Sequence, residues 1–261
     1  MTTGKSSLMR RVLITLRYDG SRYHGWQRQK NALCVQEVLE NALPLAFPAD
    51  GFFYRAAGVS RTDAFVHALN QKCVFDMPRE ALKCPVENLP FVLNRFLPPD
   101  VVCADACFVS LDFNVHKQTV EKTYRYQIYN DIHPAPALRQ YVWHIKPALD
   151  VSAMRRAARF LTGKHNFEAF AAAGSSVLSY ERTIFGVNIE QSEKTVSIYI
   201  RADGFLYNMA RIITGTLVYA GLGKIEAERT EAIILSRDRA QAGITAPPQG
   251  LTLYDTVLRN C

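Results

Sequence analysis

The sequence lacks the features that define several common classes of protein. Its six cysteines are scattered, none stands in a C-x-x-C pair, and no cysteine and histidine cluster has the spacing of a zinc site. We therefore expect reduced thiols, no metal site and no disulfide framework, which suits a cytoplasmic protein. No uninterrupted apolar run is long enough to cross a membrane. The basic first residues are not followed by a long apolar segment, so a secretory signal is not predicted either.

Low-complexity tracts and long flexible linkers are also missing. The 261 residues are 48% hydrophobic and 21% charged, which is ordinary for a globular protein of one large or two smaller domains. A weak boundary signal lies at residues 112–120, and each half of the chain reads as a strand, a helix and further strands. We therefore predict two related α+β lobes, at residues 1–112 and 113–261.

Charge is the feature present in excess. The formal net charge is +7, and among the first thirty residues seven lysines and arginines face only one acidic residue, Asp19. Tyrosines and a tryptophan are interleaved with these cations. Phosphates need cations and unstacked bases need aromatic faces, so this mixture favours an RNA partner.

Hydrophobic periodicity predicts the elements. An alternating pattern is typical of strands, and apolar residues at spacings of three and four are typical of helices. Asp150 and Gly163 stand at the expected caps of one helix, and Pro44 limits another that begins near residue 35. The capped helix is 151–161, and two more helices are expected at 86–97 and 205–220. The expected strands are 11–18, 52–57, 71–75, 101–109, 122–129, 182–189 and 195–202.

The segment from residue 57 to residue 68 holds the densest chemistry. Small residues lead into Arg61, Thr62 and Asp63, and on an extended segment Arg61 and Asp63 would point to the same side. A neighbouring guanidinium keeps a carboxylate ionised, as a nucleophile or charge stabiliser requires. The alternative is a turn in which Ser60, Thr62 or Asp63 caps a helix that begins near Ala64.

Two further sites carry polar groups in apolar surroundings. Arg211 lies in the most apolar predicted helix, with Asn208 and Thr214 three residues to either side. Such an arginine either reaches water or meets a carboxylate, because an unpaired buried charge is costly. Tyr124 and Tyr126 share one face of a strand, which is either a packed sheet face or a base-stacking platform.

These motifs resemble the tRNA pseudouridine synthase A family. Residues 60–67 read S-R-T-D-A-F-V-H and are similar to that family's G-R-T-D-A-G-V-H. Further similar blocks keep the family's order and span nearly the whole chain. They are residues 18–29, 35–37, Asn94 with 97–98, 124–126, 204–209 with Arg211, and 250–251.

The resemblance implies a fold and a reaction. The fold would be two lobes whose antiparallel sheets join side by side, with helices on one face and a basic cleft between the lobes. The activity would be isomerisation of uridine to pseudouridine at positions 38–40 of the tRNA anticodon stem-loop. The uracil is cut from its ribose, turned and rejoined through carbon 5, which needs no cofactor or metal. A homodimer is also implied.

The resemblance assigns residues to roles as well. Asp63 would be the catalytic carboxylate acting on a flipped-out uridine, and Arg61 would stabilise the flipped state. Tyr124 would stack on the uracil, Leu251 would pack on its other side, and Arg211 would pair with Asp63.

Other candidates surround this centre. His67 would brace the catalytic loop beside the substrate. The basic and aromatic residues of the preceding loop would contact RNA; they are Arg22, His24, Trp26 and Arg28.

The sequence departs from the family pattern beside the predicted carboxylate. Ser60 and Phe65 replace two glycines, which could change the geometry of the loop, and Asn114, Val115 and His116 replace histidine, alanine and arginine. Two other classes therefore stay open. One is a non-catalytic RNA-binding or RNA-folding protein of the same architecture, and the other is a small-molecule hydrolase that uses Asp63 with an arginine partner.

Overall fold

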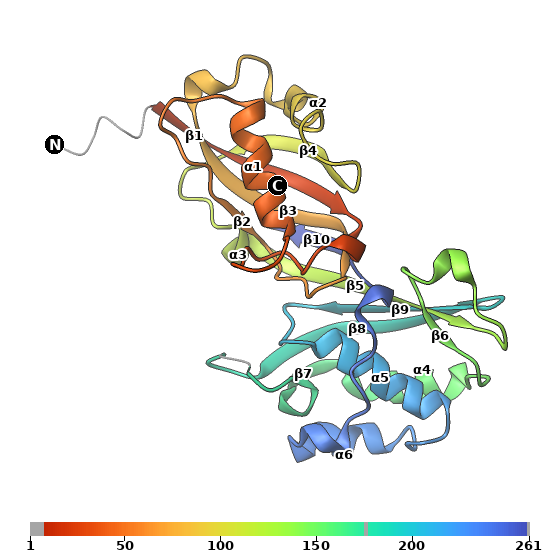
Figure 1. The fold of residues 1–261 in the computed structure, drawn as a ribbon. Helices are drawn as coiled ribbons and strands as arrows, with labels where there is room; N and C mark the ends of the chain where they lie inside the picture. Colours follow the sequence, from red (N-terminus) through yellow and green to blue (C-terminus); the bar gives the residue numbers. More distant parts are fainter. Residues whose placement is uncertain (1–7, 175–176, 260–261) are drawn as a thin grey trace. The chain divides into compact units, whose positions relative to one another are not determined.

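The computed structural model describes residues 8–174 and 177–259, and the chain divides into two compact units. The first unit runs up to Val120 and takes up the chain again from Asp255, and the second is Glu121–Tyr254. Each unit combines helices with a sheet that is mainly antiparallel (Figure 1), so the predicted α+β class is confirmed. The sequence pattern placed the boundary after residue 112 and did not show that the end of the chain returns to the first unit.

The sheet of the first unit has the strand order β4-β1-β3-β10, and β2 pairs with β3. Residues 12–16 of β1 are all buried, although alternation predicts that only one face is covered. Leu13 and Val74 pack with Val115 on one face of the sheet, so the residues of β1 on that face are also buried. The bounds are β1 (Met9–Tyr18), β2 (Ala56–Gly58), β3 (His67–Pro78), β4 (Val101–Val109) and β10 (Leu251–Leu258), of which the part from Asp255 belongs to this unit.

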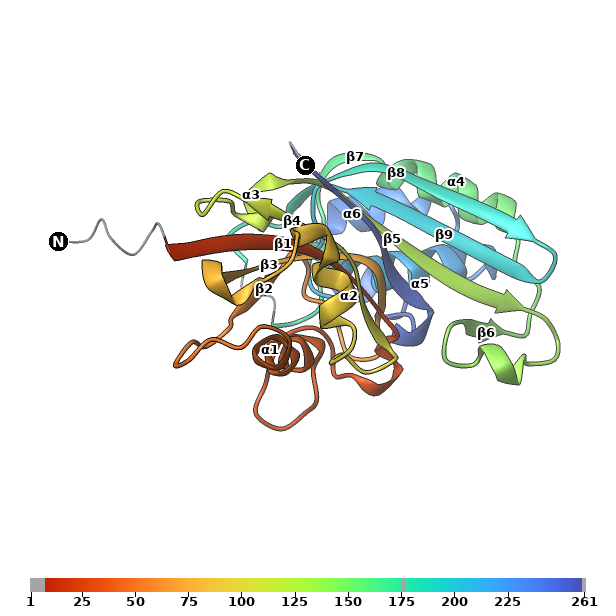
Figure 2. The same cartoon turned by 90° about the horizontal axis from the view of Figure 1, so that it is seen from above.

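The helices of the first unit differ from their predicted lengths. Helix α1 (Val35–Ala46) continues past Pro44, which lies inside its last turn. Helix α2 is only Leu89–Leu93, followed by Asn94, whose side-chain amide exchanges two hydrogen bonds with the backbone of Cys103 in β4 (2.7 and 2.9 Å). Figure 2 shows α1 and α2 on the same side of the strands, and α3 (Val115–Gln118) completes the unit.

The sheet of the second unit has the order β10-β5-β9-β8-β7, and β6 runs parallel to β5. Strands β8 and β9 form a hairpin whose turn is only Glu193 and Lys194, shorter than the gap between the predicted strands 182–189 and 195–202. The predicted strand at residues 195–202 is confirmed without change as β9. The remaining bounds are β5 (Thr119–Asn130), β6 (Trp143–Ile145), β7 (Gly163–Asn166), β8 (Glu181–Ser192) and β9 (Thr195–Ala202).

Three helices cover one face of this second sheet (Figures 1 and 2). Helix α4 (Val151–Leu161) has the predicted bounds, and its N-cap Asp150 accepts a hydrogen bond from the Ala153 N–H at 3.0 Å. Helix α5 (Met209–Gly221) begins later than predicted, because Asn208 has a left-handed backbone (φ 60°) that no helix can include. Helix α6 (Arg229–Ser236) was not predicted.

The buried cysteines of the described residues form no disulfide. They are Cys34, Cys73 and Cys103, and burial raises the pKa of Cys103 to about 12. In residues 8–174 and 177–259, no helix has the length and hydropathy of a membrane span. The same residues contain no group of three or more histidine, cysteine or acidic side chains placed to hold a metal ion.

Candidate active site

Asp63 lies half-buried in the irregular segment that joins β2 to β3. The segment closes in a tight turn, in which the Val66 N–H donates to the Asp63 carbonyl at 3.2 Å. The turn leads directly into β3 at His67. The alternative interpretation, in which Asp63 or a neighbour caps a helix, is therefore wrong.

A second loop, Asp19–Gln29, holds the Asp63 segment in place. The backbone N–H of Trp26 donates to the Thr62 carbonyl at 3.1 Å, and the Phe65 N–H donates to the Tyr23 carbonyl at 3.0 Å. The hydroxyls of Tyr18 and Thr62 form a buried hydrogen bond of 2.8 Å. These bonds restrain the backbone on both sides of Asp63, which is the pre-organisation that a catalytic group needs.

Two glycines make this close approach possible. Gly25 has a φ of 90°, and a Cβ atom there would lie 2.3 Å from the Thr62 carbonyl oxygen. A Cβ atom on Gly58 would lie 2.4 Å from the indole ring of Trp26. Any side chain at either position would force the two loops apart.

His67 braces this junction from inside. Its side chain is buried, and its Nδ1 accepts a hydrogen bond from the Gly20 N–H at 3.0 Å. The Asp19 carboxylate lies 3.2 Å from the same ring nitrogen, so two groups of the Asp19–Gln29 loop meet His67. Gly20 has no room for a side chain, since a Cβ atom would lie 2.1 Å from the Val66 carbonyl oxygen. The geometry supports the predicted bracing role, and a contact of His67 with substrate stays a prediction.

The two departures from the family glycines have different consequences. Ser60 is buried, and its backbone is not among the described positions with positive φ. Phe65 has a φ of 66° at the third position of the Asp63–Val66 turn, where a type II turn requires positive φ. A side chain in this region costs about 1–2 kcal/mol relative to ordinary backbone. Phe65 therefore holds strain that a glycine would relieve.

The remaining residues of the Asp19–Gln29 loop have distinct environments. Trp26 is only 2% exposed, so its burial argues against the predicted contact with RNA and gives it a packing role. Tyr23 is also buried and donates to Asp100 at 2.6 Å; burial, followed by this bond, raises its pKa. His24 and Arg22 are exposed, and Arg22 forms an ion pair with Asp100 at 3.2 Å.

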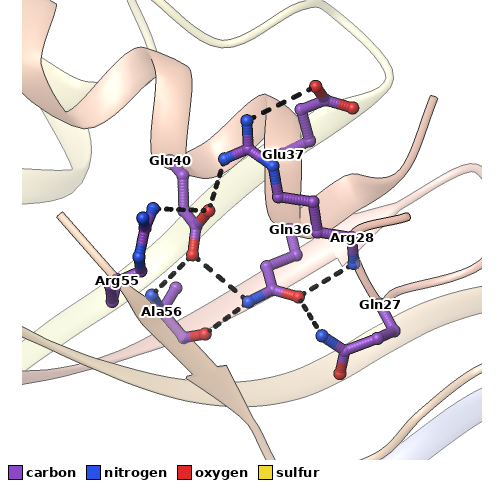
Figure 3. Close-up of polar contacts among 7 residues, drawn as sticks. All are labelled: Gln27, Arg28, Gln36, Glu37, Glu40, Arg55 and Ala56. Carbon is purple, nitrogen blue, oxygen red and sulfur yellow. Dashed lines mark hydrogen bonds and ion pairs between the residues drawn. The ribbon is translucent and has the colours of Figure 1, made fainter. Parts of the chain in front are cut away.

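A buried carboxylate ties the end of this loop to α1 and β2. Glu40 receives the guanidinium of Arg28 at 2.9 Å and the backbone N–H of Ala56 at 3.1 Å, while Arg55 approaches to 3.7 Å (Figure 3). Gln36 extends the network through bonds to Glu40 and Ala56 and to the loop at Gln27 and Arg28. We call these residues, with Glu37, the Glu40 cluster. Arg28, predicted to bind RNA, has its charge engaged here.

In the second unit, the predicted stacking residue Tyr124 is buried in β5. Its ring meets Phe205 edge-on, with centroids 4.8 Å apart. Leu251, predicted to pack on the base, is buried at the start of β10. Tyr126 donates its hydroxyl to the Pro247 carbonyl at 2.7 Å, and its ring leaves no room for a side chain on Gly250. Of the two tyrosines, Tyr126 is therefore a core residue.

Arg211 projects from the first turn of α5 and is half-buried. Its Nε donates to the Ala246 carbonyl and its Nη1 to the side-chain oxygen of Asn208, both at 2.7 Å. Thr214, the other half of the predicted polar stripe, instead donates to the Ala210 carbonyl. These bonds restrain the guanidinium, whereas its predicted pairing with Asp63 joins residues of different units and stays a prediction.

Sequence reasoning missed several residues that shape these sites. Glu40 occupies one more polar position on an amphipathic helix, after the family-like block at residues 35–37, so no local pattern marks its role. Phe205 lies in a segment predicted as helix, which hid its contact with Tyr124. The Gly25 and Gly58 contacts join segments far apart in the chain, so no local pattern could reveal them.

Comparison with known proteins identifies the class. A family model described as tRNA pseudouridine synthase matches residues 157–257. The tRNA pseudouridine synthase A of Thermoanaerobacter sp. is 47% identical over 249 residues, which are 95% of this chain and 100% of that protein. Its counterpart in Acetivibrio thermocellus is 43% identical, covering 95% and 99% of the two chains, and tRNA pseudouridine synthase A 2 of Clostridium tetani is 39% identical, covering 95% and 98%. The chain therefore belongs to the tRNA pseudouridine synthase A family.

Proposed function

We propose that this protein isomerises uridine to pseudouridine at positions 38–40 of the tRNA anticodon stem-loop, with Asp63 as the catalytic carboxylate. Membership of the family supports the reaction class. The observation that supports Asp63 is its setting, because the backbone around it is bonded to the Asp19–Gln29 loop on both sides. A carboxylate on a restrained turn between exposed cationic and aromatic side chains is suited to an RNA substrate.

The chemistry follows from the geometry of a base within RNA. A uridine inside a helical stem must leave the stack before its glycosidic bond can be reached, at a cost of a few kcal/mol. Arg61 is exposed two residues before Asp63, where a cation can hold phosphate or fill the vacated space. Asp63 then acts at the sugar or the base, and an ionised carboxylate stabilises positive charge that develops on the ribose. Tyr124 and Leu251 are the proposed walls around the uracil.

Asp63→Asn tests the proposal directly. We expect pseudouridine formation on an unmodified tRNA transcript to fall by at least about 1,000-fold, because the group that acts on substrate is lost. The affinity for tRNA should stay within several-fold of wild type, since the amide keeps the shape of the turn. Mapping of pseudouridine by chemical labelling and primer extension measures the product and its position.

Asp50→Asn is the matched control, because Asp50 is an exposed carboxylate of the same unit. It should retain full activity. Product from the Asp63→Asn protein at the wild-type rate would remove Asp63 from the mechanism, and product only outside positions 38–40 would refute the proposed target. A steep fall of tRNA affinity with rising salt separates an RNA enzyme from a small-molecule hydrolase.

A further inference from the structure

We propose that Phe65 and His24 form an exposed stacking platform for an unpaired nucleobase that neighbours the target uridine. This inference rests on the proposed function of Asp63 and adds a residue that determines how the RNA is held. Phe65 lies two positions after Asp63, on the same tight turn. Phe65 is 41% exposed although its backbone is part of a restrained loop.

The two rings come from different segments and meet at the surface. The centroids of Phe65 and His24 are 5.7 Å apart and their planes are inclined by 51°. His24 is itself exposed, so the pair presents ring surface to solvent. Aromatic side chains on which bases stack are the common means of holding single-stranded RNA, and they tolerate any base because every base has a flat face.

The backbone holds the Phe65 ring in this place. The Phe65 N–H donates to the Tyr23 carbonyl at 3.0 Å, next to His24 in the chain. The positive φ of Phe65 (66°) is set by the turn that carries Asp63. A residue whose backbone is already restrained loses little further backbone freedom when a base stacks on its ring, which favours binding.

Strain at this position agrees with a role in binding. A glycine satisfies the same turn without penalty, so the phenylalanine costs stability while its ring stays largely at the surface. A cation lies on the same segment, since Arg61 is exposed four residues before Phe65. Rings that hold bases together with cations that hold phosphates define a site for single-stranded RNA.

The test compares variants at one position. Phe65→Leu keeps the strained backbone and removes the ring, and Phe65→Gly removes both. We expect each to raise the KM for a tRNA transcript by about tenfold with kcat changed by less than about threefold, because the ring acts in the bound complex before chemistry. Phe65→Tyr should rescue the affinity to within about twofold. Phe91→Leu, at a phenylalanine of the same unit that is 75% exposed, is the control and should leave KM unchanged.

A direct readout uses an anticodon stem-loop RNA that carries 2-aminopurine beside the target uridine, since stacking quenches its fluorescence. Wild-type and Asp63→Asn proteins should quench this signal, and Phe65→Leu and His24→Ala should lose most of the quenching. Wild-type KM and quenching in Phe65→Leu, or a higher kcat/KM in Phe65→Gly, would overturn the platform while leaving the proposed function intact. Quenching that depends on Phe65 without product at positions 38–40 would support the platform and refute the proposed function.

Discussion

The two units hold their predicted catalytic side chains by different means. In the first unit, Asp63 lies on an irregular turn whose position depends on contacts with a second loop and on two glycines. In the second unit, Arg211 and Tyr124 project from a helix and a strand, and short side-chain contacts adjust them. The position of Asp63 therefore depends on each contact between the two loops, and loss of one contact should displace it. The positions of Arg211 and Tyr124 are set by the backbone of a helix and of a strand.

After Asp63→Asn, the largest effect is expected for Arg211→Ala, which tests the second unit. We expect a loss of pseudouridine formation of about 100-fold or more, because the variant removes a restrained cation for which we propose a role in stabilising charge. The tRNA affinity should change far less, and the loss of the bond to the buried Ala246 carbonyl should lower the free energy of unfolding by roughly 1–3 kcal/mol. Arg229→Ala, at the start of α6, serves as the control. Equal losses of activity and affinity would recast Arg211 as an RNA-binding residue.

Gly58→Ala tests the first unit, where a single methyl group should matter. Its Cβ atom would lie 2.4 Å from Trp26 and 2.7 Å from the Gln71 amide, so we expect a loss of about 2–3 kcal/mol in the free energy of unfolding. Urea denaturation followed by Trp26 fluorescence, in a Trp143→Phe background that leaves one tryptophan, measures this loss. Gly186→Ala is the matched control, because a Cβ atom at that position would have nothing within 4 Å. Equal stability of the two variants would show that the loops can move apart to accept a methyl group at residue 58 without loss of stability.

Glu40→Gln tests whether the Glu40 cluster holds the same loop. Arg28 and the Ala56 N–H both donate to the Glu40 carboxylate. The glutamine amide has only one oxygen to accept these bonds, and its NH2 group would face a donor. We therefore expect the first unit to lose roughly 1–3 kcal/mol of unfolding free energy. The Trp26 fluorescence assay applies again. Glu37→Gln should cost far less, because its contact with Arg28 is longer (3.7 Å) and its side chain is 28% exposed. If Glu40→Gln leaves the free energy of unfolding unchanged, the backbone hydrogen bonds of the Asp19–Gln29 loop are sufficient to hold it.

Lys122→Met is the one substitution in this series that is expected to raise stability. Burial, with the charge of Arg182, lowers the pKa of Lys122 to about 8, below the unfolded value of 10.5. The charged lysine therefore destabilises the fold at pH 7, a cost that fades as the pH rises from about 8 to 10.5. We expect a gain of roughly 1–3 kcal/mol at pH 7 that shrinks toward pH 10.5, measured by urea denaturation. Exposed Lys146→Met should show neither effect.

Regular elements were predictable from the sequence because their causes are local. The period of apolar residues and the Asp150 cap define α4, and turn residues and alternation define β9. Helix α5 was predicted to begin too early, because the left-handed backbone of Asn208 is not visible in an apolar run. Pro44 was predicted to end α1, yet a proline late in a helix removes one hydrogen bond without stopping the last turn.

Candidate site residues could be predicted from the sequence where a local pattern of residue types marks them. Arg61, Thr62 and Asp63 are candidates from their residue types alone. The resemblance to family motifs gave roles to Arg211 and Tyr124, and Leu251 became a candidate only through it. The burial of Trp26 was missed, because it follows from Gly58, a residue distant in the chain. The exposure of Phe65 and its contact with His24 were missed for the same reason: they depend on how two loops meet.

The position of the last strand, β10, affects the order in which the two units can fold during synthesis. Leu251–Tyr254 of β10 belongs to the second unit, and the following residues belong to the first. There Asn70 donates to Asp255 at 2.6 Å, the Thr256 hydroxyl donates to the Asn70 carbonyl at 3.0 Å, and the Arg259 N–H donates to the Gln118 carbonyl at 2.7 Å. During translation, the first unit must therefore wait with an open sheet edge until the ribosome has synthesised the whole of the second.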